Sequence, residues 1–470
     1  MSFTTPEFLL LLAATCLLYF NLARNGQNIV VLVAGLVFYG WWDWRFLFLI
    51  FATTAADYVC ALGITASKSE RRRKAFLTAA IVINLVVLAF FKYLDFLVRS
   101  LTDIARLAGG KGESSIVGIV LPLGISFYTF HALSYAVDVY RGKAAPERNY
   151  LVYLSYVMFF PLLVAGPIER AWHLIPQFKR DRHVTRDMVR SGLLLCASGF
   201  FKKLVIADNV AVLANYGFGN PSASGATHLI AVYAFAFQIY CDFSGYSDIA
   251  AGTARILGFE VFQNFNLPYL TTNPRDFWRA WHISLSSWFR DYVYIPLGGS
   301  RGSRWSTLRN LAITMLLCGL WHGASWIFVL WGAFHGVMFV MYDVWSRSAP
   351  GQWVTARKDA LAQTLKVLVF FQLVCLGWLL FRSDSVKQAR DMLRSIAFNF
   401  SWDANAFNLL MKLAILTVPL VLTQIYQKHA GLAPWNSWEL RSQVLAIGAA
   451  MVLIALMGAP IRTQFIYFQF

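Results

Sequence analysis

Ala75-Phe-Leu-Thr-Ala-Ala-Ile-Val-Ile-Asn-Leu-Val-Val-Leu-Ala-Phe-Phe91 is a run of 17 residues without one charged side chain. An α-helix needs ~20 mostly apolar residues to cross the hydrocarbon core of a bilayer, where every backbone amide must be paired within the chain. Continued to Val98, the stretch reaches that length. It predicts a membrane-spanning helix over residues 75–98.

Comparable apolar stretches recur along the whole sequence. The others are Glu7–Leu22, Ile29–Trp42, Phe46–Ala66, Ile116–Val139, Leu151–Ala165, Gly192–Ala214, Leu229–Phe259, Leu308–Leu320, Trp326–Tyr342, Leu365–Phe381, Leu409–Ile425 and Val444–Met457. Several are too short to cross unaided, so we expect roughly ten to twelve transmembrane helices plus re-entrant or interfacial ones. Both flanks of residues 151–165 are basic, which favours a segment that enters the membrane and returns. The predicted fold class is an all-α polytopic integral membrane protein, with a single domain over residues 1–470.

Composition supports a membrane protein and argues against a nucleic-acid-binding one. Hydrophobic residues make up 58% of the chain and charged residues 14%, with a mean hydropathy of +0.54, whereas soluble domains carry ~25% charged residues. The net charge of +17 comes from basic residues in short loops, as the positive-inside rule predicts. Placing the basic cluster of residues 68–74 in the cytosol after three spans puts the N-terminus outside. The six cysteines show no C-x-x-C spacing, so neither a disulfide framework nor a metal site is expected.

The stretch from Phe262 to Arg309 interrupts the hydrophobic rhythm and is the first place to look for a site. Polar chain between membrane segments is tolerated where it is buried in protein or lines a cavity. Read as one helix over Pro274–Arg290, it places Arg279, His282, Ser286 and Arg290 on one face. Either the helix lies at the interface with its tryptophans at the headgroups, or its polar face lines an internal cavity.

His322 stands inside the apolar segment Cys318-Gly-Leu-Trp-His-Gly-Ala-Ser325. An ionisable group there is costly and indicates function, and neutral imidazole can accept and return a proton near pH 7. From the sequence alone, a catalytic base and a packed core histidine both stay open. Gly319 and Gly323 would allow a neighbouring helix or a thin acyl chain to approach closely. His335 is 13 residues further on and about 220° round a continuous helix, so we expect it outside the site, and we interpret the remaining histidines as structural or surface residues.

Two more groups of side chains are candidates. Asp242, Tyr246 and Asp248 lie in Tyr240-Cys-Asp-Phe-Ser-Gly-Tyr-Ser-Asp248, where each carboxylate has a hydroxyl four residues away. This spacing favours hydrogen bonds that fix the helix, although transporters use such residues as proton relays. The sequence ends Gln464-Phe-Ile-Tyr-Phe-Gln-Phe470, which fits an aromatic interfacial anchor. Alternatively, Tyr467 supplies a hydroxyl that a base such as histidine must activate.

Two segments resemble the central motifs of the membrane-bound O-acyltransferase family. They are Asp276-Phe-Trp-Arg-Ala-Trp-His-Ile-Ser-Leu-Ser-Ser-Trp-Phe-Arg-Asp-Tyr-Val-Tyr-Ile-Pro-Leu-Gly-Gly299 and Leu320-Trp-His-Gly-Ala324. Within that family the chain is similar to the bacterial branch of alginate O-acetylation and teichoic acid D-alanylation. The resemblance implies helices around a central tunnel. At Ala280 the chain departs from relatives that often have a second arginine.

The resemblance also implies roles for single residues. His322 matches the essential histidine, expected as general base, and His282 matches the second catalytic position, expected to orient the acyl group or stabilise the oxyanion. Tyr467 matches a C-terminal position that would carry a transient acyl group. Arg279 and Arg290 could hold an anionic group. Asp242, Tyr246, Asp248 and Trp321 are expected as supporting or substrate-binding residues.

The implied function is transfer of an acetyl group from a cytosolic thioester, acetyl-CoA or an acyl carrier protein, across a bacterial inner membrane. An extracytoplasmic acetyltransferase partner would then O-acetylate an exported polysaccharide, expected to be alginate, with cellulose or peptidoglycan as alternatives. Membrane lipid is an expected partner, nucleic acid is not, and no bound cofactor or metal is expected. Without the resemblance, a proton-coupled transporter with a buried His/Asp path and a membrane scaffold with packed histidines stay open.

Overall fold

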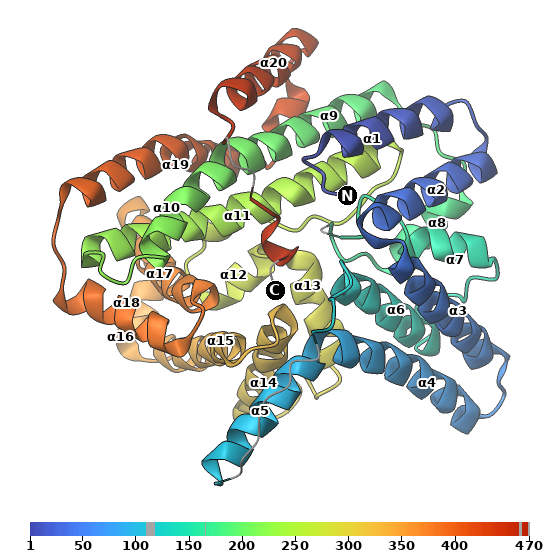
Figure 1. Ribbon diagram of the computed structural model, residues 1–470, viewed down its shortest axis with the longest axis horizontal. Helices are drawn as coiled ribbons and strands as arrows, with labels where there is room; N and C mark the ends of the chain where they lie inside the picture. The colour runs from blue at the N-terminus through green and yellow to red at the C-terminus, as the bar shows by residue number, and fades with distance from the viewer. Residues whose placement is uncertain (110–117, 165, 460–462, 469–470) are drawn as a thin grey trace. The chain divides into compact units, whose positions relative to one another are not determined.

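The computed structural model describes residues 1–109, 118–164, 166–459 and 463–468, and within these residues every regular element is a helix (Figure 1). The all-α prediction is confirmed. The chain forms two compact units, one of Met1–Leu193 with Ile249–Phe262 and one of Leu194–Asp248 with Gln263–Phe470. The single domain over residues 1–470 stays a prediction.

The first unit contains the N-terminal helices. They are α1 (Pro6–Tyr19), α2 (Arg24–Asp43), α3 (Arg45–Ala66), α4 (Glu70–Leu88), the π-helical turn η1 (Ala89–Tyr93), α5 (Leu94–Leu107), α6 (Ile125–Tyr140), α7 (Tyr150–Val157) and α8 (Ala171–Lys179). Two helices, α9 (Arg186–Phe200) and α11 (Gly225–Ile256), contribute residues to both units. Helix α7 has eight residues and is only ~12 Å long, so the described part of the predicted stretch 151–165 contains no helix that could cross the membrane. Positions 116, 117 and 165 of the predicted stretches lie outside the described residues.

The second unit contains the remaining elements. They are η2 (Phe201–Ala207), α10 (Asp208–Phe218), η3 (Pro268–Leu270), α12 (Pro274–Ala280), α13 (Ile283–Phe289), η4 (Arg290–Tyr294), α14 (Arg304–His322), α15 (Trp326–Trp345), α16 (Ala349–Ala356), α17 (Ala360–Arg382), α18 (Val386–Phe398), α19 (Ala404–Ala430), η5 (Pro434–Ser437), α20 (Leu440–Met457) and η6 (Ile466–Phe468). Beyond α20, the chain returns to α11 with the short turn η6, drawn in red (Figure 1).

Seven helical segments of the described chain are long and apolar enough to cross a membrane. They are Arg45–Ala66, Glu70–Leu107, Gly225–Ile256, Trp326–Trp345, Ala360–Arg382, Ala404–Ala430 and Leu440–Met457. Helices α2 and α14, with 20 and 19 residues, have a similar length but a more polar composition. The multi-pass membrane protein is therefore confirmed, and a total of ten to twelve spans stays a prediction.

The most deeply buried of these spans is α11, whose apolar window is 83% buried although its 32 residues form one continuous helix. A helix that is apolar on all sides belongs in the interior of a protein. Its residues up to Asp248 therefore form an internal wall of the second unit, and Asp242, Phe243 and Tyr246 are all buried on it.

Helices α14 and α15 pack unusually closely because glycines face each other. A Cβ atom on Gly319 would lie 2.3 Å from the carbonyl oxygen of Phe328, and one on Gly332 would lie 2.4 Å from that of Met315. The close approach brings Trp331 of α15 against His322, with ring centroids 4.9 Å apart. The expectation that Gly319 admits a neighbouring helix is confirmed.

We predict that Gly319→Ala lowers the stability of the protein by about 1–3 kcal/mol, because a methyl group there forces the two backbones apart. The matched control is Gly448→Ala in α20, where an added Cβ meets nothing within 4 Å. Both proteins would be purified in the same detergent and their thermal unfolding midpoints compared. An unchanged midpoint for Gly319→Ala would show that α14 and α15 tolerate a wider separation.

Candidate active site

The predicted single helix over Pro274–Arg290 is wrong. Asn273 caps α12 by accepting a hydrogen bond from the backbone N–H of Asp276, and α12 ends at Ala280. His282 then adopts φ 42° and ψ 55°, a left-handed conformation, before α13 begins. The predicted polar stripe does not form, because the side chain of Arg279 is 80% exposed while His282 is fully buried.

Hydrogen bonds of Asn264 stabilise this break between α12 and α13. Its carbonyl oxygen accepts the N–H of Ile283 at 2.9 Å, and its side-chain oxygen accepts the hydroxyl of Ser284 at 2.6 Å. Its side-chain amide donates to the hydroxyl of Ser247 on α11 at 3.0 Å. A left-handed non-glycine residue costs about 1–2 kcal/mol, and such strain persists only where surrounding bonds fix it, commonly at functional sites. The break places the imidazole of His282 in the interior.

His282 lies among aromatic rings. Its ring centroid is 4.5 Å from that of Phe243 and 6.2 Å from that of Trp321. Within the described part of the chain, neither ring nitrogen has a hydrogen-bond partner. Burial lowers the pKa of His282 well below its usual value, because an apolar surrounding disfavours the charged form. The residue is therefore a neutral imidazole with one N–H and one lone pair to offer.

His322 is the last residue of α14 and is 3% exposed. Besides Trp331, its ring contacts Trp321 at a centroid distance of 4.9 Å and Phe381 at 5.4 Å. The ring therefore lies at the end of a helix pair whose separation the facing glycines fix. Among the predicted supporting residues, Trp321 contacts both histidines.

Tyr467 lies next to both imidazoles. Its ring centroid is 5.6 Å from that of His322, 6.0 Å from that of His282 and 4.7 Å from that of Phe243. The preceding residues Phe465 and Ile466 are 0% and 2% exposed, so the prediction of an interfacial anchor is wrong for these two residues; residues 469 and 470 lie outside the described part of the chain. Burial raises the pKa of Tyr467 well above its usual value, so its hydroxyl stays protonated until a base removes the proton.

The structure does not bring the two predicted arginines to this cluster. Arg279 forms its ion pair with Asp276 at 3.6 Å, and Arg290 forms one with Asp291 at 2.8 Å, both with largely exposed side chains. Because each cation is paired with a close neighbour in sequence, a role in holding an anionic group stays a prediction.

The carboxylates on α11 meet lysines that the sequence reading did not include. Asp242 forms a 2.8 Å ion pair with Lys203, and Asp248 forms a 2.6 Å ion pair with Lys202. Tyr246 stacks on Phe465, with centroids 4.2 Å apart. Both lysines lie in the predicted apolar stretch 192–214, and a cation inside such a stretch is itself a sign of function that could have found them.

Two further buried histidines, His335 and His131, have structural contacts. Nδ1 of His335 accepts a hydrogen bond from the indole N–H of Trp278 at 3.3 Å, and its ring packs on Trp331. The 220° argument does not apply, because α14 and α15 are separate helices. Nε2 of His131 accepts the backbone N–H of Glu169.

A pocket of about 360 Å³ adjoins the cluster. Its lining residues are Asn215, Phe235, Gln238, Ser325, Ile327, Phe328, Phe381, Arg382, Ser383, Asp384, Thr463 and Ile466. Phe381 also touches the ring of His322, and Ile466 directly precedes Tyr467. The side-chain oxygen of Gln238 is buried without a hydrogen-bond partner among the described residues, so it can accept a hydrogen bond from a bound hydroxyl or amide group.

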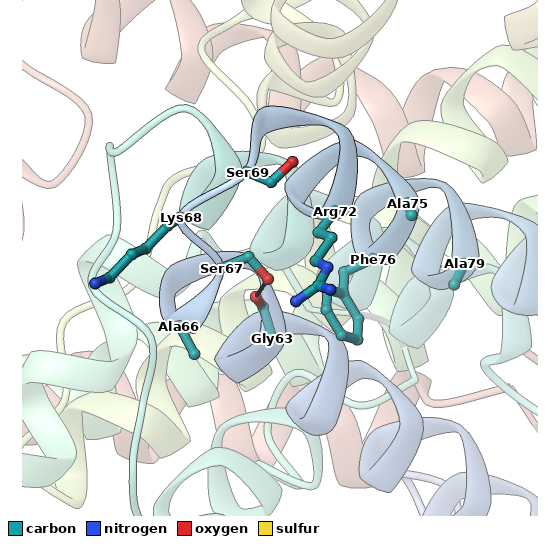
Figure 2. A pocket seen from close by; sticks show the side chains of 9 residues that line it. All are labelled: Gly63, Ala66, Ser67, Lys68, Ser69, Arg72, Ala75, Phe76 and Ala79. Atoms are coloured by element: carbon teal, nitrogen blue, oxygen red, sulfur yellow. Dashed lines mark hydrogen bonds between the residues drawn. The ribbon is translucent and has the colours of Figure 1, made fainter.

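A second pocket, of about 940 Å³, lies in the first unit at the corner between α3 and α4 (Figure 2). Figure 2 shows the side chains of Arg72 and Phe76 directed towards Gly63, where an added Cβ would lie 2.7 Å from the phenyl ring. None of its nine lining residues is a histidine, a tyrosine or an acid. The pocket is basic, through Lys68 and Arg72.

Fold and site together define a polytopic membrane protein with two buried histidines near one tyrosine ring. The model of MBOAT, the membrane-bound O-acyltransferase family, matches residues 145–380. A probable alginate O-acetylase of Pseudomonas aeruginosa is 37% identical over 445 residues, covering 94% of this chain and 84% of that protein. A peptidoglycan O-acetyltransferase of Helicobacter pylori is 32% identical, covering 84% and 79%. A teichoic acid D-alanyltransferase of Bacillus subtilis is 27% identical, covering 55% and 68%.

The chain belongs to the membrane-bound O-acyltransferase family. The predicted resemblance is confirmed over most of the chain, and so is the predicted class of enzyme, an O-acyltransferase.

We predict that His282→Gly unfolds at a higher temperature than His282→Ala, because glycine adopts a left-handed conformation without the penalty of about 1–2 kcal/mol that a Cβ carries. Both variants lose the imidazole, so both should lose acyl transfer. The measurements are thermal unfolding of the purified proteins and acylation in cells that carry each variant. Equal unfolding temperatures would show that His282 is not held in the left-handed conformation.

Proposed function

We propose that the protein transfers an acetyl group from a cytosolic thioester, across a bacterial inner membrane, to an extracytoplasmic acetyltransferase that O-acetylates an exported polysaccharide. The observation that carries the proposal is the position of Tyr467, with both imidazole rings within about 6 Å of its own ring. Alginate is the proposed polymer, because the Pseudomonas aeruginosa relative covering 94% of the chain is a probable alginate O-acetylase.

In the first half-reaction, His322 removes the proton from the hydroxyl of Tyr467 while the phenolic oxygen attacks the thioester carbonyl carbon. The imidazole N–H of His282 donates to the developing oxyanion, a contribution that the apolar surrounding strengthens. The C–S bond then breaks, the thiol leaves with the proton from His322, and an acetyl ester of Tyr467 remains. General-base assistance of this kind contributes typically ~10²–10⁴ in rate.

In the second half-reaction, a hydroxyl group of the acceptor attacks the ester carbonyl carbon. His322 takes the hydroxyl proton and returns it to the phenolic oxygen of Tyr467, so that the ester forms on the acceptor and the enzyme is restored. The pocket that adjoins Phe381 and Ile466 is the proposed approach for the acceptor. Gln238 would orient the hydroxyl by accepting a hydrogen bond from another donor group of the acceptor.

The donor is proposed to be acetyl-CoA or an acetylated acyl carrier protein. Both are anionic, and the basic pocket around Lys68 and Arg72 would attract an anionic carrier to that end of the first unit. A bound metal or cofactor plays no part in the proposed steps, which use only side chains of the chain and its substrates.

Peptidoglycan is the second candidate acceptor polymer, because the Helicobacter pylori relative covering 84% of the chain is a peptidoglycan O-acetyltransferase. A proton-coupled transporter is the alternative of another class, and the buried pair of Lys203 and Asp242 is the observation that favours it. Acetyl analysis of alginate and peptidoglycan from a deletion strain separates the two polymers. Proton-driven solute uptake by reconstituted vesicles, without acyl transfer, would favour the transporter.

We predict that His322→Ala reduces acetylation of the exported polymer by ~10²-fold or more, because the general base is lost. His429→Ala is the control, since His429 is exposed at the end of α19. Acetyl content is measured in a deletion strain complemented with each variant, at equal amounts of membrane protein. Normal acetyl content with His322→Ala would refute the proposed role.

We predict that Tyr467→Phe blocks the first half-reaction, because the phenyl ring fills the same space without the attacking oxygen. Under turnover with a thioester donor, mass spectrometry should find an acetyl adduct on the C-terminal peptide of the wild type. The same peptide of the variant should carry no acetyl adduct. Full activity of Tyr467→Phe would show that the acyl group passes directly from donor to acceptor.

A further inference from the structure

Three charged side chains meet in the interior of the second unit. Nζ of Lys203 lies 2.8 Å from a carboxylate oxygen of Asp208 and 2.8 Å from one of Asp242, and the three side chains are 0%, 1% and 2% exposed. Removing such charges from water costs several kcal/mol per ion, and their mutual attraction offsets this only when the remaining hydrogen bonds are also made. The other partners of these groups therefore matter.

Those partners belong to the C-terminal segment. The ammonium of Lys203 donates to the carbonyl oxygen of Thr463 at 2.9 Å and lies 3.1 Å from its hydroxyl, which donates in turn to Asp208. The second oxygen of Asp242 accepts the backbone N–H of Ile466 at 2.7 Å. An ammonium has three N–H donors, and here two meet carboxylates while the third meets Thr463. The third contact of the ammonium and the hydrogen bond to the second oxygen of Asp242 therefore both come from the C-terminal segment.

The same elements hold the chain where it leaves α20. The side-chain amide of Asn209 donates a hydrogen bond to the carbonyl oxygen of Met457 at 2.8 Å. The backbone N–H of Ala459 donates one to the carbonyl oxygen of Leu204 at 3.2 Å. Lys203 and Leu204 belong to η2, a π-helical turn whose extra residue per turn is frequent at functional sites. Residues 457–459 and 463–466 thus contact one short stretch, residues 203–209, and the α11 residue that Lys203 binds.

We propose that Lys203, Asp208 and Asp242 form a clamp that holds the C-terminal segment and so positions Tyr467 next to the two histidines. The clamp binds the backbone N–H of Ile466, the residue before Tyr467. At Thr463 it binds the backbone carbonyl oxygen as well as the hydroxyl. It therefore sets the path of the chain. The three residues are positioning residues, since they touch the segment and not the reacting atoms. The expected effect of the clamp on acyl transfer rests on the proposed function, whereas its hold on the C-terminal segment does not.

A neighbouring ion pair provides a matched control. Lys202 is the preceding residue of η2, and its ion pair with Asp248 joins η2 to α11 in the same way as that of Lys203 with Asp242. Its side chain is 14% exposed and, among the described residues, it forms its ion pair with Asp248 and not with residues 463–468. Lys202→Met and Lys203→Met therefore remove the same charge from the same turn, and only the second loosens the C-terminal segment.

The experiment compares wild type, Lys202→Met, Lys203→Met and Thr463→Val as full chains in lipid nanodiscs and in complemented cells. The readout of position is hydrogen exchange of the C-terminal peptide that contains Ile466, whose N–H exchanges when the clamp opens. We expect exchange at least about tenfold faster in Lys203→Met, and a fall of acyl transfer by ~10²-fold, as for a misplacement of about 1 Å. Thr463→Val keeps all three charges and should show a smaller change in the same direction, which covers the case in which Lys203→Met does not fold. Lys202→Met should match wild type.

The outcomes separate the clamp from the chemistry. In the Tyr467→Phe background, Lys203→Met should cause no further loss of acyl transfer, because its effect passes through Tyr467. If Tyr467→Phe is fully active, the acyl carrier is refuted, while the exchange data still test the clamp. Unchanged exchange in both Lys203→Met and Thr463→Val would overturn the clamp, and so would lost activity with normal exchange, which would indicate another role for Lys203.

Discussion

The site depends on one backbone conformation, the left-handed residue His282. A continuous helix over residues 274–290 would direct this imidazole along the same face as Arg279, towards the exposed side. Two short helices joined at His282 turn it instead into the wall formed by Phe243 and Trp321. The cost of the left-handed residue is offset by the hydrogen bonds of Asn264, which connect the break to α11 through Ser247. The position of His282 thus depends on three chain segments together: the break between α12 and α13, the segment with Asn264, and α11 with Ser247.

Burial divides the polar groups of the second unit into two kinds. The histidines and Tyr467 lie among aromatic rings, and burial disfavours the charged forms of His282 and Tyr467. The full charges are gathered elsewhere, at Lys203 and its two carboxylates, where each has an opposite charge within 3 Å. In the proposed mechanism one proton moves over the short distance from the phenol of Tyr467 to the imidazole of His322. The ammonium of Lys203 is already paired with its own carboxylates and takes no part in this step.

Much of this arrangement could be predicted from the sequence, for reasons that differ between residues. Spans such as residues 75–98 follow from apolar length alone, and His322 stood out because a titratable group in an apolar segment is costly. The break at His282 was missed, since Trp281 and His282 are ordinary helix residues and the bonds that end the helix come from Asn264, 18 positions earlier. Lys203 was missed because it was counted within an apolar stretch, and two of its three partners, Asp242 and Thr463, are 39 and 260 residues away. Local sequence patterns therefore predict the membrane spans, whereas long-range hydrogen bonds, which no local pattern shows, determine the geometry of the site.

The attachment of the C-terminal segment limits how an acyl group on Tyr467 could travel. The hydrocarbon core is ~30 Å thick, and a carrier that crossed it would need a long free segment. Ile466 is bound through its backbone to Asp242 on α11, so in this conformation Tyr467 can move little more than its own side chain, and it already touches Phe243 and both histidines. In the proposed mechanism, donor and acceptor therefore both come to Tyr467, each from its own side of the membrane. The choice of polymer would then belong to the partner that presents the acceptor hydroxyl, which is consistent with relatives named for different polymers sharing this chain's family.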